Sequence, residues 1–136
     1  MFRKDQLAAN FTLSPPASEM DIKTEESAYG APFPKDYLDF ARISDGAYTQ
    51  GNLNILSVKG IIKRNQDYEV EQYLPEYFLI GDDGGGMAVL IKNNDGKIYE
   101  VDMGIMDEES MKLSAESLEE LIVNLKGKSL VERDGW

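Results

Sequence analysis

The sequence predicts an α+β domain: a central antiparallel sheet of four to six strands, with N-terminal helices and a C-terminal helix packed on it. Two apolar runs, at residues 77–81 and 86–93, flank an acidic, glycine-rich turn and indicate neighbouring strands. Helical spacing of apolar residues dominates both ends of the chain. The 136 residues suit one domain with one core, so residues 1–136 are taken as one unit.

The amino-acid composition excludes several classes of function. The chain has no cysteine and no histidine, which removes disulfides, thiol catalysis and the commonest general base. With 25 acidic and 14 basic residues, the formal net charge is −11, which disfavours nucleic acid as a partner and favours a basic protein surface. No apolar run has membrane-spanning length, so we expect no membrane contact and a cytoplasmic protein.

Two helices are predicted in the N-terminal half. Ser18 is a good N-cap and Gly30 a good C-terminal stop, so the first helix spans residue 18 to about residue 29. Pro34 at a first helical position begins the second helix, which Gly46 closes in a left-handed conformation. The other expectations here are weak structure in residues 1–17, a short strand at 53–55, a helical turn at 57–62 and a loop or irregular strand at 67–74.

The turn Asn94-Asp95-Gly96 predicts a β-hairpin and its register. A three-residue loop pairs only apolar residues on one face, whereas a two-residue loop would oppose Ile91 to Glu100. Because a slip of one residue exchanges the two faces of a strand, we expect the all-apolar register. Its pairs are Asn93–Lys97, Ile91–Tyr99, Val89–Val101 and Met87–Met103.

The C-terminal part predicts a short edge strand and one helix. Met111 and Leu113 are typical of the strand. Ser114 then caps a helix that Gly127 ends, and residues 128–136 form a polar tail in which Trp136 either tucks back or is disordered. The helix carries one apolar stripe, formed by Leu118, Leu121, Ile122 and Leu125.

The glycine-rich turn is interpreted as architecture. The spacing of Gly81 and Gly86 matches a phosphate-binding loop, but Met87-Ala88 occupies the positions that require Lys and Ser or Thr. Asp82 and Asp83 would also repel phosphate. A dinucleotide site fails as well, because the glycines lead into a strand rather than a helix. A tight turn or bulge between central strands explains the glycines better.

Other candidate sites are also weak. A calcium loop centred on Gly96 would need Ile91 as its first ligand, which the coordination pattern does not allow. The paired acids at 82–83, at 100 and 102, and at 107–109 are not placed in a predicted cleft, as a glycosidase would require. We therefore predict no enzymatic activity, no cofactor and no metal.

Two motifs resemble the SMI1/KNR4 family, also called the SUKH superfamily, over residues 18–125. The first is an acid, hydrophobe and glycine that end one helix, followed by a hydrophobe–proline pair that opens the next. Ser44-Asp45-Gly46 resembles the family's following turn, and residues 118–125 fit its C-terminal helix. Met87 and the missing tryptophan after the second helix depart from many members. The residues that carry the two motifs are Glu26, Tyr29, Gly30, Phe33, Pro34, Tyr37 and Phe40, then Leu74-Pro75 and Ile80 to Gly86.

The resemblance implies both fold and function. It implies helices against an antiparallel sheet, in agreement with the pattern above. Bacterial members are largely immunity proteins that bind and neutralise a cognate toxin, whereas fungal members regulate cell-wall synthesis through protein contacts. We expect an immunity protein for a basic, nuclease-type toxin; a regulatory or scaffold module is the alternative. The acidity either forms a binding patch or only keeps the domain soluble. The residues expected to contact the partner are Asp82, Asp83, Asp107, Glu108, Glu109 and Tyr48.

Overall fold

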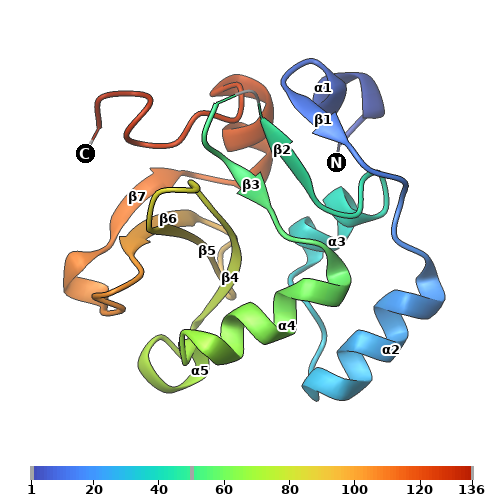
Figure 1. Ribbon diagram of the computed structural model, residues 1–136, viewed down its shortest axis with the longest axis horizontal. Coiled ribbons are helices and arrows are strands. Elements are labelled where there is room, and N and C mark those ends of the chain that lie inside the picture. Colours follow the sequence, from blue (N-terminus) through green and yellow to red (C-terminus); the bar gives the residue numbers. More distant parts are fainter. Residues whose placement is uncertain (1, 50, 136) are drawn as a thin grey trace.

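The chain folds around an antiparallel sheet whose strands follow one another in sequence order (Figure 1). The computed structural model describes residues 2–49 and 51–135, and within them the sheet has seven strands, slightly more than predicted. The strands are β1 Phe11–Leu13, β2 Ala47–Thr49, β3 Asn54–Ile55, β4 Tyr77–Asp82, β5 Met87–Lys92, β6 Ile98–Asp102 and β7 Lys112–Ala115. The helices are α1 Lys4–Ala8, α2 Glu19–Tyr29, α3 Lys35–Ala41, α4 Val58–Asp67 and α5 Val70–Tyr73, with a 3-10 turn η1 Glu108–Ser110 and a π-helical turn η2 Glu120–Asn124.

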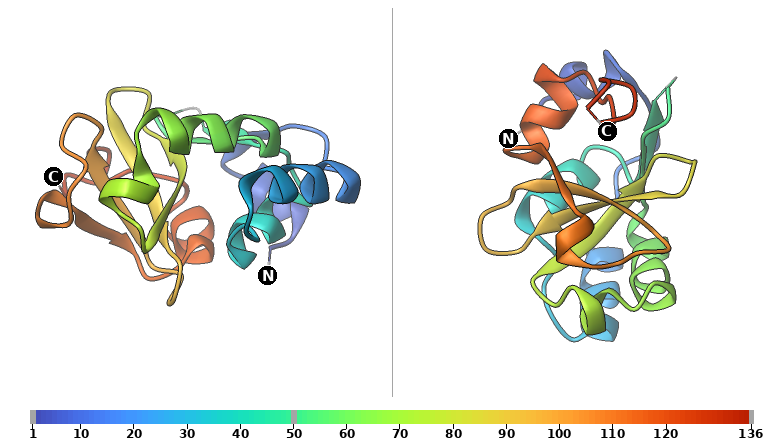
Figure 2. Two further views of the ribbon diagram at one scale, coloured as in Figure 1. Left: turned by 90° about the horizontal axis from the view of Figure 1, so that it is seen from below. Right: turned by 90° about the vertical axis from the view of Figure 1, so that its left-hand side faces the viewer.

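The first two predicted helices are present with their expected start signals. The Ser18 hydroxyl accepts a hydrogen bond from the Asp21 backbone N–H at 3.0 Å, and Gly30 ends α2 in the left-handed region. Helix α3 begins after Pro34 but ends at Ala41, so Gly46 (φ 79°) shapes the following turn instead of capping the helix. Figure 2 shows these two helices on one side of the molecule, with α4 reaching toward α2 from the sheet.

The sheet is buried on both faces, and each face carries its own core. The main core packs β4–β7 residues such as Phe78 and Val89 against the helices, where Tyr37 and Phe40 are fully buried. The second core is smaller and lies on the opposite face around Leu79. Its other buried members are Val70, Leu74, Tyr77, Ala88, Leu90 and Val101, with Tyr68, Tyr99, Met103, Met106 and Met111 packed against them.

The predicted register of the β5–β6 hairpin is wrong by one residue. The loop has four residues, because the Lys92 N–H donates to the Lys97 carbonyl at 2.9 Å. Since β5 is apolar on both faces, the alternation that guided the prediction does not distinguish one face from the other. The observed pairs are Ile91–Ile98, Leu90–Tyr99, Val89–Glu100, Ala88–Val101 and Met87–Asp102, in place of Ile91–Tyr99, Val89–Val101 and Met87–Met103.

Glu100 is tolerated in the sheet because the C-terminal segment supplies it with partners. Its carboxylate accepts hydrogen bonds from the Ser114 hydroxyl at 2.7 Å and from the Leu130 N–H at 2.9 Å. The Arg133 guanidinium in turn donates to the Ser114 carbonyl at 2.9 Å. The segment predicted as a polar tail is therefore bonded to β6 and β7 through Leu130 and Arg133, and Trp136 lies outside the described residues.

Three other parts of the chain differ from the sequence prediction, because contacts with distant residues determine their secondary structure. The final helical turn is capped by Ser117, whose hydroxyl accepts from the Glu120 N–H at 3.0 Å, because Ser114 lies inside β7. The segment predicted as a loop or irregular strand at 67–74 contains the end of α4 and all of α5. Two elements near the N-terminus, α1 and β1, carry the buried residues Leu7 and Phe11 and were not predicted.

Candidate protein-binding surface

The two aspartates of the glycine-rich loop hold that loop together. Asp82 is 7% exposed and Asp83 is 8% exposed. The Asp83 carboxylate accepts from the N–H groups of Gly85 and Met87 at 2.8 and 2.9 Å. The Asp82 carboxylate accepts from the Gly84 N–H at 2.9 Å and from the Arg64 guanidinium at 2.8 Å. Contact of either residue with a partner stays a prediction.

Gly81 belongs to the same architecture. Its position has no room for a side chain, since a Cβ there would collide with the Asn54 carbonyl of β3. The pairing of β4 with β5 also shifts between Leu79 and Gly81, which marks a β-bulge. The Asn54 side-chain amide completes the joint by donating to Asp82 at 3.1 Å. The glycine spacing thus serves the packing of three strands.

A groove lies on the face of the second core, between the α4–α5 junction and the loop that joins β6 to β7. Its volume is about 520 Å³. Tyr68, Met103 and Met106 are partly buried there, and Tyr73 and Ile105 are 55% and 51% exposed. We call this hollow the α5 groove; its lining residues are Asp67, Tyr68, Glu69, Tyr73, Met103, Gly104, Ile105, Met106 and Asp107.

Acidic side chains surround the α5 groove. Asp107, one of the residues expected to bind a partner, lines it together with Glu69 and Asp67. Asp67 is paired with Lys63 at 3.2 Å, whereas Glu69 and Asp107 are exposed. No lysine or arginine occurs among the described residues that line the groove. The groove therefore combines apolar side chains with acidic ones and has a negative rim.

The predicted acids Glu108 and Glu109 lie beside this rim, in the turn η1. Asp107 caps that turn, because its carboxylate accepts from the Ser110 N–H at 2.8 Å. The Tyr77 hydroxyl donates to Glu108 at 3.4 Å. Burial, followed by the negative charge of Glu108, raises the pKa of Tyr77 to about 12, so this phenol stays protonated at neutral pH.

Tyr48 occupies a different part of the surface. It lies on β2, opposite Thr12 and Asn54, and its side chain is 55% exposed. Strand β2 is near one edge of the sheet, whereas β6 and β7 form the other edge. The structure therefore brings Asp107, Glu108 and Glu109 together and leaves Tyr48 apart from them.

Of the residues that line the groove, only Asp107 was predicted to bind a partner, and Glu69, Tyr73 and Ile105 are among those that were missed. Glu69 and Tyr73 lie in the segment predicted as a loop or irregular strand, and Ile105 lies between predicted strands, so none of the three belonged to a periodic apolar pattern. Glu69 has a positive φ of 53°, which is uncommon for a residue with a side chain. The acidic residues at 107–109 were the sequence feature that could have located the groove, because Asp107 forms part of one wall.

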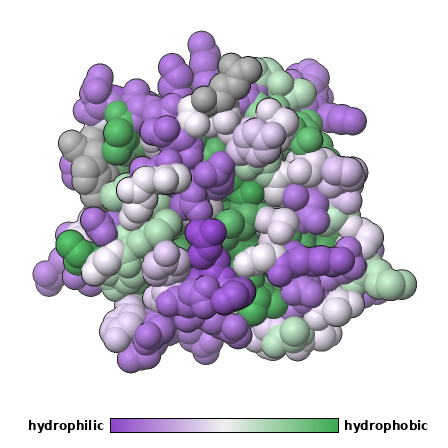
Figure 3. Space-filling view, in the orientation of Figure 1, coloured by the Kyte–Doolittle hydropathy of each residue, from purple (hydrophilic) through white to green (hydrophobic). Residues whose placement is uncertain are grey.

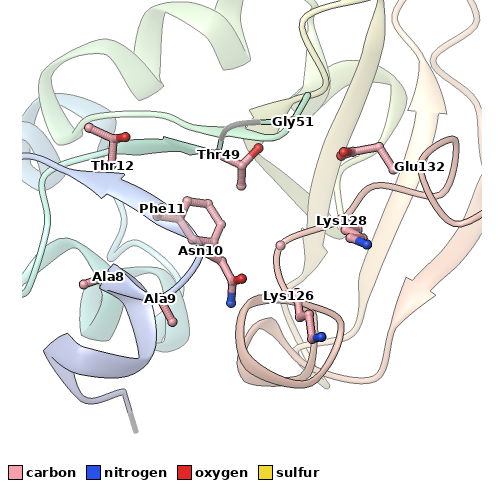
Figure 4. A pocket seen from close by; sticks show the side chains of 11 residues that line it. Ala8, Ala9, Asn10, Phe11, Thr12, Thr49, Gly51, Lys126, Lys128 and Glu132 are labelled. Carbon is pink, nitrogen blue, oxygen red and sulfur yellow. The ribbon is translucent and has the colours of Figure 1, made fainter.

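A smaller hollow of about 250 Å³ lies between the turn after α1 and the segment after η2 (Figure 4). Lys126 and Lys128 line it from one side, and Asn10, Phe11 and Thr49 line it from the other. Glu132 is also present, so the local charge is mixed. This hollow does not extend the acidic surface of the α5 groove.

The wider surface is mostly hydrophilic. Figure 3 shows hydrophilic side chains over α4 and α5, with hydrophobic ones visible along a furrow in the middle of that face. Within residues 2–49 and 51–135, no group of three or more acidic side chains is placed to hold a metal ion. None of the helices found in those residues is both long and apolar enough to cross a membrane.

The fold defines the class: an α+β domain with helices packed on an antiparallel sheet. A model of the SMI1 / KNR4 family (SUKH-1) matches residues 16–124, so the chain belongs to this family, and the resemblance seen in its motifs is confirmed. The chain is also similar to the uncharacterized protein YnaB of Bacillus subtilis (strain 168), with 35% identity over 85 residues. The alignment covers 62% of this chain and 57% of YnaB, little more than half of that relative.

Proposed function

We propose that this chain is an immunity protein of a polymorphic toxin system, which binds a cognate toxin in the cytoplasm and has no catalytic activity of its own. The observation that carries the proposal is the convergence of exposed acids from the α4–α5 junction and the β6–β7 loop around a groove that also presents apolar side chains. Such a surface combines the apolar contact and the charge that protein recognition uses.

The chemistry of the expected toxin supports this pairing. A nuclease must present basic residues to hold phosphate, so its active face is positive. A protein of net charge −11 is attracted to that face and, once bound, would deny it to nucleic acid. Asp107, Glu108 and Glu109 are the exposed acids proposed to meet it, while Asp82 and Asp83 keep the adjoining loop in shape.

Co-expression with the toxin encoded by a neighbouring gene tests the proposal. We expect cells to survive only when the immunity chain is present, and the two proteins to co-elute from a sizing column. Inhibition by binding is stoichiometric, so toxin activity should fall linearly until the two proteins are equimolar. A toxin that still kills, with no complex formed, would refute the proposal; a gene with no toxin beside it would favour the regulatory alternative.

A further inference from the structure

The α5 groove is preformed by hydrogen bonds in both of its walls. On the loop side, the Asp102 carboxylate accepts from the Gly104 N–H at 2.7 Å, and the Met103 N–H donates to the Gly86 carbonyl at 2.8 Å. On the helix side, the Leu74 N–H donates to the Val70 carbonyl at 2.7 Å. A ligand would therefore meet walls that are already ordered, which lowers the entropic cost of binding.

The groove has room for at least one large apolar side chain and apolar residues that could contact it. Its volume of about 520 Å³ falls within the range of small-ligand pockets. Two methionines lie in it beside Tyr68, and methionine adapts its shape to irregular partners. Tyr73 and Ile105 stand exposed at its sides, where an inserted side chain would cover them.

The acidic rim of the groove favours a positively charged binding partner. Glu69 and Asp107 are exposed, and the described lining contains no cation to neutralise them. An acidic or neutral segment would gain nothing from this rim, whereas lysine or arginine beside the apolar anchor would be attracted to it. Glu69 is also held at φ 53°, a strained conformation of the kind that recurs at binding sites.

We infer that the α5 groove docks a basic segment of another protein, which inserts one large apolar side chain between Tyr73 and Ile105 and places a flanking lysine or arginine against Glu69 and Asp107. This inference rests on the proposed function, because it names the part of the toxin that would be gripped. It also assigns the main aromatic contact to Tyr73, whereas the sequence had led us to expect Tyr48 to contact the partner.

Selection of displayed twelve-residue peptides on the full chain tests the inference without the toxin. The groove variant is Tyr73→Ala with Ile105→Ala, and the matched control is Tyr48→Ala with Val131→Ala, whose side chains are 55% and 48% exposed. A charge variant, Glu69→Lys, is compared with Glu116→Lys, an exposed acid outside the groove. Circular dichroism confirms that each variant is folded.

We expect recovered peptides to carry lysine or arginine next to one large apolar residue. Their affinity should fall at least tenfold in the groove variant and in Glu69→Lys, and stay within twofold in both controls. Recovery of no such peptide, unchanged binding to the groove variant, or loss of binding in the Tyr48 control would overturn the inference. Concentration-dependent self-association abolished by the groove variant would overturn it too, since it would identify a second copy as the occupant. A toxin could still be bound elsewhere, so co-expression judges the proposed function separately.

Discussion

Glu100 illustrates how one residue couples the sheet to the chain end. It is 1% exposed, its Oε2 atom is hydrogen-bonded, and its Oε1 atom has no partner among the described residues. Burial, opposed by the Ser114 and Leu130 hydrogen bonds, raises the pKa of this carboxyl above its ordinary value of 4.5. The charged form is therefore the less favourable one in the folded state.

This raised pKa predicts an unusual pH dependence. Between pH 4.5 and the raised pKa of Glu100, the folded state binds more protons at this site than the unfolded state does. The contribution of Glu100 to the free energy of unfolding should therefore grow as pH falls through the raised pKa, and be least favourable above it. Urea unfolding of wild type and Glu100→Gln across pH measures this, with exposed Glu109→Gln as control. A wild-type-minus-variant difference that does not change with pH would contradict the prediction.

Asp83 is predicted to matter for stability through the loop that it closes. Asp83→Ala removes the charged acceptor of the Gly85 and Met87 N–H groups, and losing hydrogen bonds to a charged group costs about 1.5–3 kcal/mol. Asp83→Asn keeps a carbonyl oxygen and should lose less. Chemical denaturation measures both, with Asp95→Ala in the exposed hairpin as comparison. Equal losses in the alanine and asparagine variants would show that the acceptor is not what holds the loop.

For helices and strands, features that depend on neighbouring residues could be predicted from the sequence. Features that depend on contacts between distant residues could not. Helix α2 was predicted because Ser18 and Gly30 act on their own neighbours. The start of the last helical turn was misplaced because Ser114 is a cap residue by type but a strand residue by context, bonded to Glu100. The hairpin register failed for the same reason: the partners of Glu100 come from residues distant in sequence. Likewise, Asp107 was predicted as a site residue, but Glu69, Tyr73 and Ile105 come to line the same groove only through the fold.

The segment that ends η2 is predicted to be sensitive to bulk at Gly127. This glycine has φ 66°, and a Cβ there would lie 2.7 Å from the ring of Phe11, which itself packs on Phe40. Gly30 serves as the control, because it has φ 89° and open space around it. Gly30→Ala therefore measures only the cost of placing a side chain at positive φ. Gly127→Ala should therefore lose about 1–3 kcal/mol more than Gly30→Ala, because overpacking adds to backbone strain. Thermal and urea unfolding measure the difference; equal losses would mean that the ring of Phe11 moves aside freely.

For the whole molecule, charge and apolar contact are predicted to control different steps of the proposed binding to a toxin. The net charge of −11 acts at long range and should speed encounter with a basic partner. Salt shortens the reach of exposed charges to about 10 Å at 0.1 M and about 3 Å at 1 M. The apolar side chains of the α5 groove act only in contact, so salt should affect them little.

Raising sodium chloride from low to high concentration should therefore slow association on the order of tenfold or more, while dissociation changes little. The variant Tyr73→Ala with Ile105→Ala should do the reverse: it keeps the association rate and its salt dependence, and speeds dissociation. Biosensor kinetics with the co-purified toxin measure both rates, and Tyr48→Ala with Val131→Ala is the control for exposed apolar loss. An association rate indifferent to salt would mean that the acidity serves solubility, the reading that composition alone left open.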